Sequence, residues 1–137
     1  MNIAIVVAEF NEKVTSRMHE VAIEKAKDLK LNIKYTCKVP GIFDMQLIID
    51  KLLQKKDIDG IVTLGAVIKG QTKHDEVIAN STARNIVKLS VNHQKPVSFG
   101  ISGPGMSERQ AYARIRSVSE NAVNAVQKID IELRRIK

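Results

Sequence analysis

The 137-residue sequence contains only one cysteine, Cys37, so no disulfide can form within the chain. We expect Cys37 to lie in a strand as a buried, unreactive thiol. No apolar stretch approaches the roughly 20 residues that a membrane-spanning helix needs. Residues 1–4 lack the charged region and the cleavage site of a signal peptide. The sequence therefore predicts a cytoplasmic protein with no membrane partner.

Acidic residues are outnumbered, with 15 Asp and Glu against 22 Lys and Arg, and the net charge is +7. A basic module that binds nucleic acid is one interpretation, and it would need a contiguous cationic face. The basic side chains are instead scattered over the expected helices, and the one dense run is at residues 134–137. A basic enzyme that acts on phosphorylated substrates, with no nucleic-acid partner, is the favoured interpretation.

Short aliphatic runs alternate with segments of helical periodicity along the whole chain. Strands are expected at 2–8, 32–38, 59–66 and 96–101, and helices at 12–30, 44–56, 73–92 and from Ser107 to about Val126. Strands that alternate with helices form parallel sheets with right-handed crossovers. We therefore predict one α/β domain over residues 1–137, a three-layer sandwich with a four-stranded parallel sheet flanked by helices, in the flavodoxin-like arrangement.

Aromatic residues are scarce, and the three phenylalanines all fall at or next to the ends of expected strands. They are Phe10, Phe43 and Phe99. Ligands of open α/β sheets bind beyond the carboxyl ends of the strands. Because the phenylalanines are concentrated at this edge of the sheet, we expect a ligand with a flat ring to stack on them. The alternative is that they close the end of the core.

The segment from Gly70 to His74 lies between the third strand and the third helix. Free N–H groups at a helix start favour an anion, and Thr72 adds a hydroxyl, so a phosphate site is plausible. His74 suits proton transfer near neutral pH, or it is an ordinary exposed histidine. His19 and His93 lie away from the strand ends, and we expect them to be solvated. No set of carboxylates, cysteines or histidines suggests a metal, so no metal and no cofactor is expected.

Four ordered blocks of sequence resemble the lumazine synthase family, and its archaeal branch in particular. The most specific is GxVIxGxTxH, which begins at Gly65 and ends at His74. The blocks are Val7-Ala8-Glu9-Phe10-Asn11, Val39-Pro40-Gly41-Ile42-Phe43-Asp44, residues 64–74, and Pro96-Val97-Ser98-Phe99-Gly100.

This resemblance implies a reaction between two small molecules. It is the condensation of 5-amino-6-(ribitylamino)uracil with 3,4-dihydroxy-2-butanone 4-phosphate to 6,7-dimethyl-8-ribityllumazine, with release of phosphate and water. His74 matches the proposed acid/base residue. The matches to the pyrimidine and ribityl positions are Phe10 with its neighbour Asn11, Ile42 with its neighbour Phe43, Asp44, Ala66, Val67, Ile68 and Phe99. The matches to the phosphate positions are Gln71, Thr72 and Arg114.

The resemblance also implies a homo-oligomer, because Phe99 and Arg114 match residues supplied by an adjacent subunit. A pentamer or an icosahedral shell of pentamers follows, with riboflavin synthase as a pathway partner. One departure is Asp44, which stands where the family usually has the longer Glu. The alternatives are an archaeal-type riboflavin synthase of the same fold, which does not need a phosphate loop, and a relative that binds the ligand without catalysis.

Overall fold

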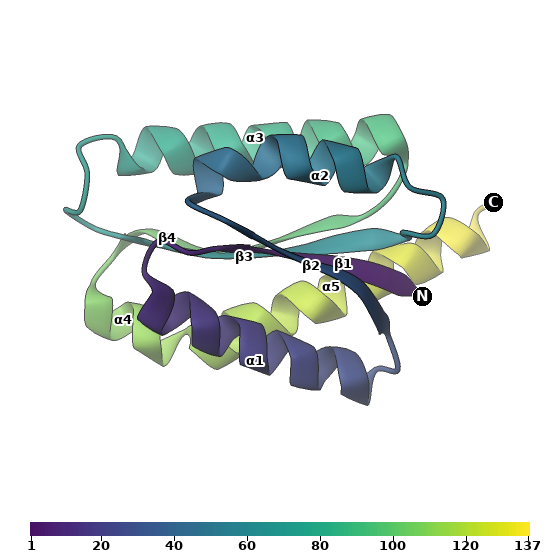
Figure 1. Ribbon diagram of the computed structural model, residues 1–137, viewed down its shortest axis with the longest axis horizontal. Helices are drawn as coiled ribbons and strands as arrows, with labels where there is room; N and C mark the ends of the chain where they lie inside the picture. The colour runs from purple at the N-terminus through teal and green to yellow at the C-terminus, as the bar shows by residue number, and fades with distance from the viewer.

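A computed structural model describes residues 1–137, and its strands and helices alternate along the chain (Figure 1). The elements are β1 (Asn2–Ala8), α1 (Glu12–Asp28), β2 (Asn32–Val39), the 3-10 helix η1 (Ile42–Asp44), α2 (Met45–Leu53), β3 (Gly60–Ile68), α3 (Asp75–His93), β4 (Val97–Met106), α4 (Glu108–Ala113) and α5 (Ile115–Arg135).

The four strands form one parallel sheet in the order β2-β1-β3-β4. From β1 the chain passes to β2 at one edge of the sheet, and it then returns past β1 to β3 and on to β4 at the opposite edge. Right-handed crossovers in opposite directions put their helices on opposite faces. Accordingly, α2 and α3 cover one face of the sheet, while α1, α4 and α5 cover the other (Figure 1). The predicted fold class, a three-layer α/β sandwich with a four-stranded parallel sheet, is confirmed.

Each face of the sheet has its own hydrophobic core. A cluster of 19 buried residues joins the sheet to α1, α4 and α5, and a separate cluster of 15 joins it to α2 and α3. All nine residues of β3 are buried, which explains its unbroken run of apolar and small side chains. The sheet is therefore a rigid platform, and its carboxyl edge carries the loops.

The last third of the chain differs from the prediction in two ways. The fourth strand continues to Met106, five residues beyond its expected end. The last helix is two helices, α4 and α5, which are separated by the single residue Arg114 (φ −95°, ψ −2°). Ser107 caps the start of α4, since its Oγ accepts a hydrogen bond from the Gln110 amide at 3.1 Å. Neither proline nor glycine marks the break, so no local signal predicts it.

Three smaller expectations about single side chains were wrong. Cys37 does lie in β2, but it is only partly buried. His19 is half-buried, and its Nε2 has no hydrogen-bond partner. His93 is not free in solvent, because its Nε2 lies 2.8 Å from Oδ1 of Asp50 and so links α3 to α2. No helix combines the length and the apolar character that crossing a bilayer requires.

Candidate active site

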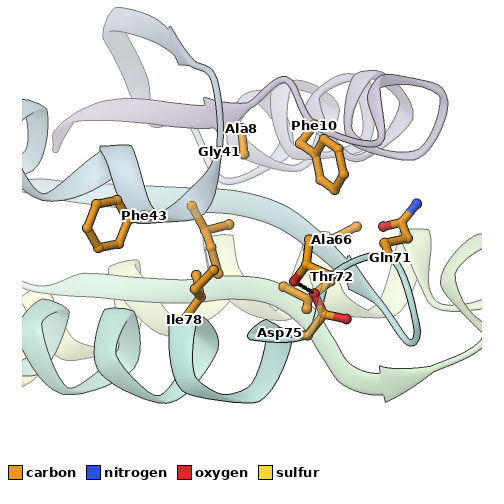
Figure 2. A pocket seen from close by; sticks show the side chains of 11 residues that line it. Ala8, Phe10, Gly41, Phe43, Ala66, Gln71, Thr72, Asp75 and Ile78 are labelled. Atoms are coloured by element: carbon orange, nitrogen blue, oxygen red, sulfur yellow. Dashed lines mark hydrogen bonds between the residues drawn. The ribbon is translucent and has the colours of Figure 1, made fainter.

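A pocket opens where the direction of the chain through the sheet reverses, between the carboxyl ends of β1 and β3. Such switch points are where open α/β sheets bind ligands, because the two flanking loops diverge to opposite faces. The pocket is lined by Ala8, Phe10, Gly41, Ile42, Phe43, Ala66, Val67, Gln71, Thr72, Asp75 and Ile78. In Figure 2, Phe10 and Phe43 lie at opposite ends of it.

The ladder between β1 and β2 continues past the ends of the strands and holds Phe10 in place. The amide of Glu9 donates to the Val39 carbonyl at 2.7 Å, and the amide of Phe10 donates to the Pro40 carbonyl at 2.9 Å. The Phe10 side chain is nevertheless 52% exposed. A fixed backbone under a half-exposed ring provides a ready surface for stacking.

The segment between β2 and α2 forms a second wall of the pocket. Ile42 reaches the sheet because Gly65 has no side chain, and a Cβ at residue 65 would lie 2.7 Å from Ile42 Cγ2. Phe43 is 64% exposed at the rim. The Asp44 carboxylate accepts a hydrogen bond from the Gly41 amide at 2.9 Å, so it shapes this turn and does not line the pocket.

The third wall is the end of β3 together with the loop that leads to α3. Ala66 and Val67 line the pocket, followed by Gln71 and Thr72. Asn11 does not line the pocket. Its Nδ2 donates to the Ala66 carbonyl at 2.8 Å and to Gln71 Oε1 at 3.0 Å, and its Oδ1 accepts from Gln71 Nε2 at 2.8 Å.

At the start of α3, the carboxylate of Asp75 contacts the loop that was expected to bind phosphate. The Thr72 hydroxyl donates a hydrogen bond to Oδ1 of Asp75, which Figure 2 marks with a dashed line. The amide of His74 donates to Thr72 Oγ1 at 3.3 Å. His74 is exposed and stands just before the helix, with Asp75 and Glu76 in the first turn. The positive end of the α3 dipole therefore already faces two carboxylates.

Seven of the thirteen residues named from the sequence meet in this one pocket. They are Phe10, Ile42, Phe43, Ala66, Val67, Gln71 and Thr72. Asn11 and His74 do not line the pocket but form hydrogen bonds with residues that do. The Asp44 carboxylate accepts a hydrogen bond from the Gly41 amide instead. Ile68 belongs to the core on the opposite face, with α1 and α5.

Phe99 and Arg114 lie outside the pocket of their own chain. The expectation that Phe99 lies at a strand end was wrong, because β4 continues to Met106 and Phe99 pairs with Thr63 within the sheet. The Phe99 side chain is still 40% exposed on the edge strand. Arg114 is exposed at the break between α4 and α5.

Sequence reasoning missed four residues that line the pocket: Ala8, Gly41, Asp75 and Ile78. Ala8 and Gly41 belong to the matching blocks and could have been included as neighbours of the named residues. Asp75 follows His74 directly, but only the turn of α3 shows that its carboxylate reaches Thr72. Ile78 is one helical turn further along α3.

A separate polar cavity lies between α1 and β2. Its lining includes Glu12, His19, Glu20 and Lys38. Burial lowers the pKa of the His19 imidazole, and the nearby Lys38 ammonium lowers it further. His19 is therefore held in its neutral form near pH 7.

Comparison with known proteins decides the family. A sequence model of the 6,7-dimethyl-8-ribityllumazine synthase family matches residues 1–133. The chain belongs to the 6,7-dimethyl-8-ribityllumazine synthase family. The resemblance noted in the four sequence blocks is thereby confirmed over nearly the whole length of the chain.

Individual lumazine synthases from archaea are similar to all or nearly all of this chain. The 6,7-dimethyl-8-ribityllumazine synthase of Sulfolobus acidocaldarius is 46% identical over 137 residues, which cover all of this chain and 87% of that protein. The enzyme of the same name from Saccharolobus islandicus is 50% identical over 136 residues, which cover 99% of this chain and 88% of that protein. That of Methanocaldococcus jannaschii is 44% identical over 137 residues and 96% of its own length.

Proposed function

We propose that the protein is a lumazine synthase of riboflavin biosynthesis. It condenses 5-amino-6-(ribitylamino)uracil with 3,4-dihydroxy-2-butanone 4-phosphate. The amine and the ketone form an imine with loss of water, phosphate then leaves by elimination, and ring closure with loss of a second water gives 6,7-dimethyl-8-ribityllumazine. Family membership supports this reaction, and the riboflavin synthase alternative is set aside because the matching family is lumazine synthase.

The observation that carries the proposal is that one pocket brings the half-exposed ring of Phe10 together with Gln71 and Thr72 of the loop before α3. Phe10, at one end of the pocket in Figure 2, would stack on the pyrimidine, while Gln71 and Thr72 lie in the loop before α3. The pyrimidine edge would lie along the ends of β1 and β3, beside Ala66 and Val67. The ribityl chain would extend toward Ile42 and Phe43. The two substrates would thus meet between a ring site and an anion site.

Holding the two substrates in attack geometry supplies most of the catalysis in this proposal. The amine is already nucleophilic and the ketone already electrophilic, so orientation can lower the barrier by several kcal/mol. His74, next to Thr72 in the same loop, would move protons during imine formation, elimination and ring closure. The chemistry needs neither a metal nor a cofactor.

We further propose that the working enzyme is a cyclic homo-oligomer, a pentamer or a shell of pentamers. The pocket of one chain has a volume of about 120 Å³, below the roughly 300–1,000 Å³ typical of ligand sites. Phe99 and Arg114 are exposed outside it and would complete the site of the next subunit. Arg114 would contact the phosphate there.

The helix α3 offers one surface for such an assembly. Three of its valines, Val77, Val87 and Val91, are each at least 60% exposed. The sequence also suggests that small side chains of α3 face a neighbouring copy, at residues 79, 81, 82, 83 and 90. Of these, Ala79 and Thr82 are buried within their own chain, whereas Ser81 is exposed. The three valines and Ser81 are therefore available for the proposed interface. The cytoplasmic location and the pathway link to riboflavin synthase stay predictions.

The direct test is incubation of the purified protein with both substrates while lumazine fluorescence is followed. We expect fluorescence only when both substrates are present, together with release of inorganic phosphate. Incubation with lumazine alone tests the alternative activity, because a riboflavin synthase would form riboflavin from it. A folded protein that gives no lumazine from the two substrates would refute the proposed function.

A further inference from the structure

Two amide side chains bridge the switch point of the sheet. Asn11 follows β1, and Gln71 lies in the loop between β3 and α3, 60 positions further along the chain. Each donates to the other, at 3.0 Å from Asn11 Nδ2 and at 2.8 Å from Gln71 Nε2. Such a reciprocal pair fixes the relative orientation of both amides, since flipping either one would place two donors or two acceptors face to face.

A third hydrogen bond sets which way the pair is oriented. Asn11 Nδ2 also donates to the Ala66 carbonyl at 2.8 Å, at the end of the buried strand β3. Because that carbonyl can only accept, the Nδ2 of Asn11 must face it. The Oδ1 is then left to receive Gln71. The rigid sheet thereby dictates where the loop amide of Gln71 can sit.

The backbone of Asn11 is suited to this task and unusual for a side-chain-bearing residue. Its φ is 65°, in the left-handed region that Asn tolerates better than most residues. This conformation lies between Phe10 and α1, and the side chain reaches the carbonyl of Ala66 in β3. Asn11 also precedes α1 without capping it through its side chain, so its amide is free for the pair.

We propose that Asn11 and Gln71 act as a positioning pair, which holds the loop 69–74 against the sheet so that Thr72 faces the pocket. The proposal rests on the proposed lumazine synthase function. Asn11 and Gln71 contact each other, and Asn11 contacts the β3 backbone. In this proposal neither side chain contacts the reacting atoms. Gln71 would influence the phosphorylated substrate by anchoring Thr72, the next residue. Asn11 would influence both substrates, because it also orients the Ala66 carbonyl beside the pyrimidine position.

A double-mutant cycle separates this role from independent contacts to substrate. Asn11→Gly removes the amide and keeps the left-handed backbone accessible, and Gln71→Ala removes its partner. Each single change should raise the KM for the phosphorylated substrate roughly 3- to 30-fold, the usual range of coupling between contacting residues. The double variant should have the same KM as Asn11→Gly, because the pair can be broken only once.

The pyrimidine substrate supplies a second pattern. Its KM should rise in Asn11→Gly and in the double variant, and it should stay unchanged in Gln71→Ala. Asn85→Ala is the matched control, since it removes another amide pair, Asn85 Nδ2 with Gln46 Oε1 at 2.9 Å, that joins α3 to α2, and Asn85 does not line the pocket. That control should leave both KM values unchanged. Single effects that multiply in the double variant would overturn the proposal.

Hydrogen exchange tests the pair without any turnover. The backbone amides of residues 69–74 should exchange faster in Asn11→Gly and in Gln71→Ala, to a similar extent, and their exchange should not change in Asn85→Ala. If the wild-type protein made no lumazine, the proposed function would be wrong. Hydrogen exchange would still show whether Asn11 and Gln71 hold the loop. Unchanged exchange in both variants would show that the pair does not hold the loop.

Discussion

The hydroxyl of Thr72 donates a hydrogen bond to the carboxylate of Asp75, and both side chains line the pocket between β1 and β3. Thr72 is proposed to bind phosphate. Its hydroxyl must therefore break the hydrogen bond to Asp75 before it can donate one to the phosphate of the substrate. A second anion beside the incoming phosphate also costs electrostatic energy. If Thr72 binds phosphate as proposed, Asp75 should weaken phosphate binding and assist phosphate release.

Replacing this carboxylate by an amide should tighten phosphate binding. Asp75→Asn should lower the KM for the phosphorylated substrate and the inhibition constant of inorganic phosphate, each roughly two- to tenfold, because partly exposed charge interactions are modest. Steady-state kinetics with added phosphate measures both. Glu76→Gln is the control, since Glu76 shares the first turn of α3 but does not line the pocket. Equal effects of both variants would contradict a specific role for Asp75.

His74→Ala should lower turnover by about 10²-fold or less, as expected for one acid/base group when orientation supplies most of the acceleration. The measurement is kcat with both substrates saturating. His93→Ala is the control, because His93 pairs with Asp50 between α2 and α3. A complete loss of activity in folded His74→Ala would show that proton transfer dominates.

Arg114→Ala should raise the KM for the phosphorylated substrate roughly 10- to 100-fold, the value of one lost hydrogen bond to a charged group. The KM for the uracil should change much less. Arg116→Ala, which removes an exposed arginine paired with Glu120 on α5, should leave both constants unchanged. Equal increases in both Michaelis constants of Arg114→Ala would mean that Arg114 does not contact phosphate.

Shared sites predict complementation between two impaired variants. His74→Ala damages the pocket side of a site, and Arg114→Ala damages the side supplied by the neighbour. In a ring with heterologous interfaces, co-refolding equal amounts should give about a quarter of the sites two intact halves. Activity measured below KM should then exceed that of either variant refolded alone. An active monomer in light scattering, or mixtures no better than their components, would rule out shared sites.

Gly103 should be far less replaceable than Gly105. Both have positive φ, 98° and 81°, but a Cβ at residue 103 would lie 2.2 Å from the Val67 carbonyl oxygen, whereas residue 105 has open space. Gly105→Ala should cost about 1–3 kcal/mol of backbone strain, and Gly103→Ala should cost clearly more. Thermal unfolding compares them. Similar losses would show that the loop can shift away from Val67.

The extent to which the sequence predicted the site depends on the kind of residue. Phe10, Ile42, Val67 and Thr72 could be placed together because parallel strands bring their carboxyl ends to one edge, which is a rule about topology and not about contacts. Asp75 could not be found in this way. Its carboxylate reaches the pocket only because α3 begins where it does, and helix starts are set by small differences in capping.

Periodicity and strand alternation determined the fold class by themselves, because a buried parallel strand such as β3 needs apolar residues on both faces and an amphipathic helix needs only one. The same patterns could not show that β4 continues past Gly103 to Met106, or that the last helix breaks at Arg114, since neither depends on a strong local preference. Only the tertiary structure decided that Asn11 meets Gln71. The two residues are 60 positions apart in the chain and come into contact only because the whole sheet packs. Local propensities therefore cannot predict this contact.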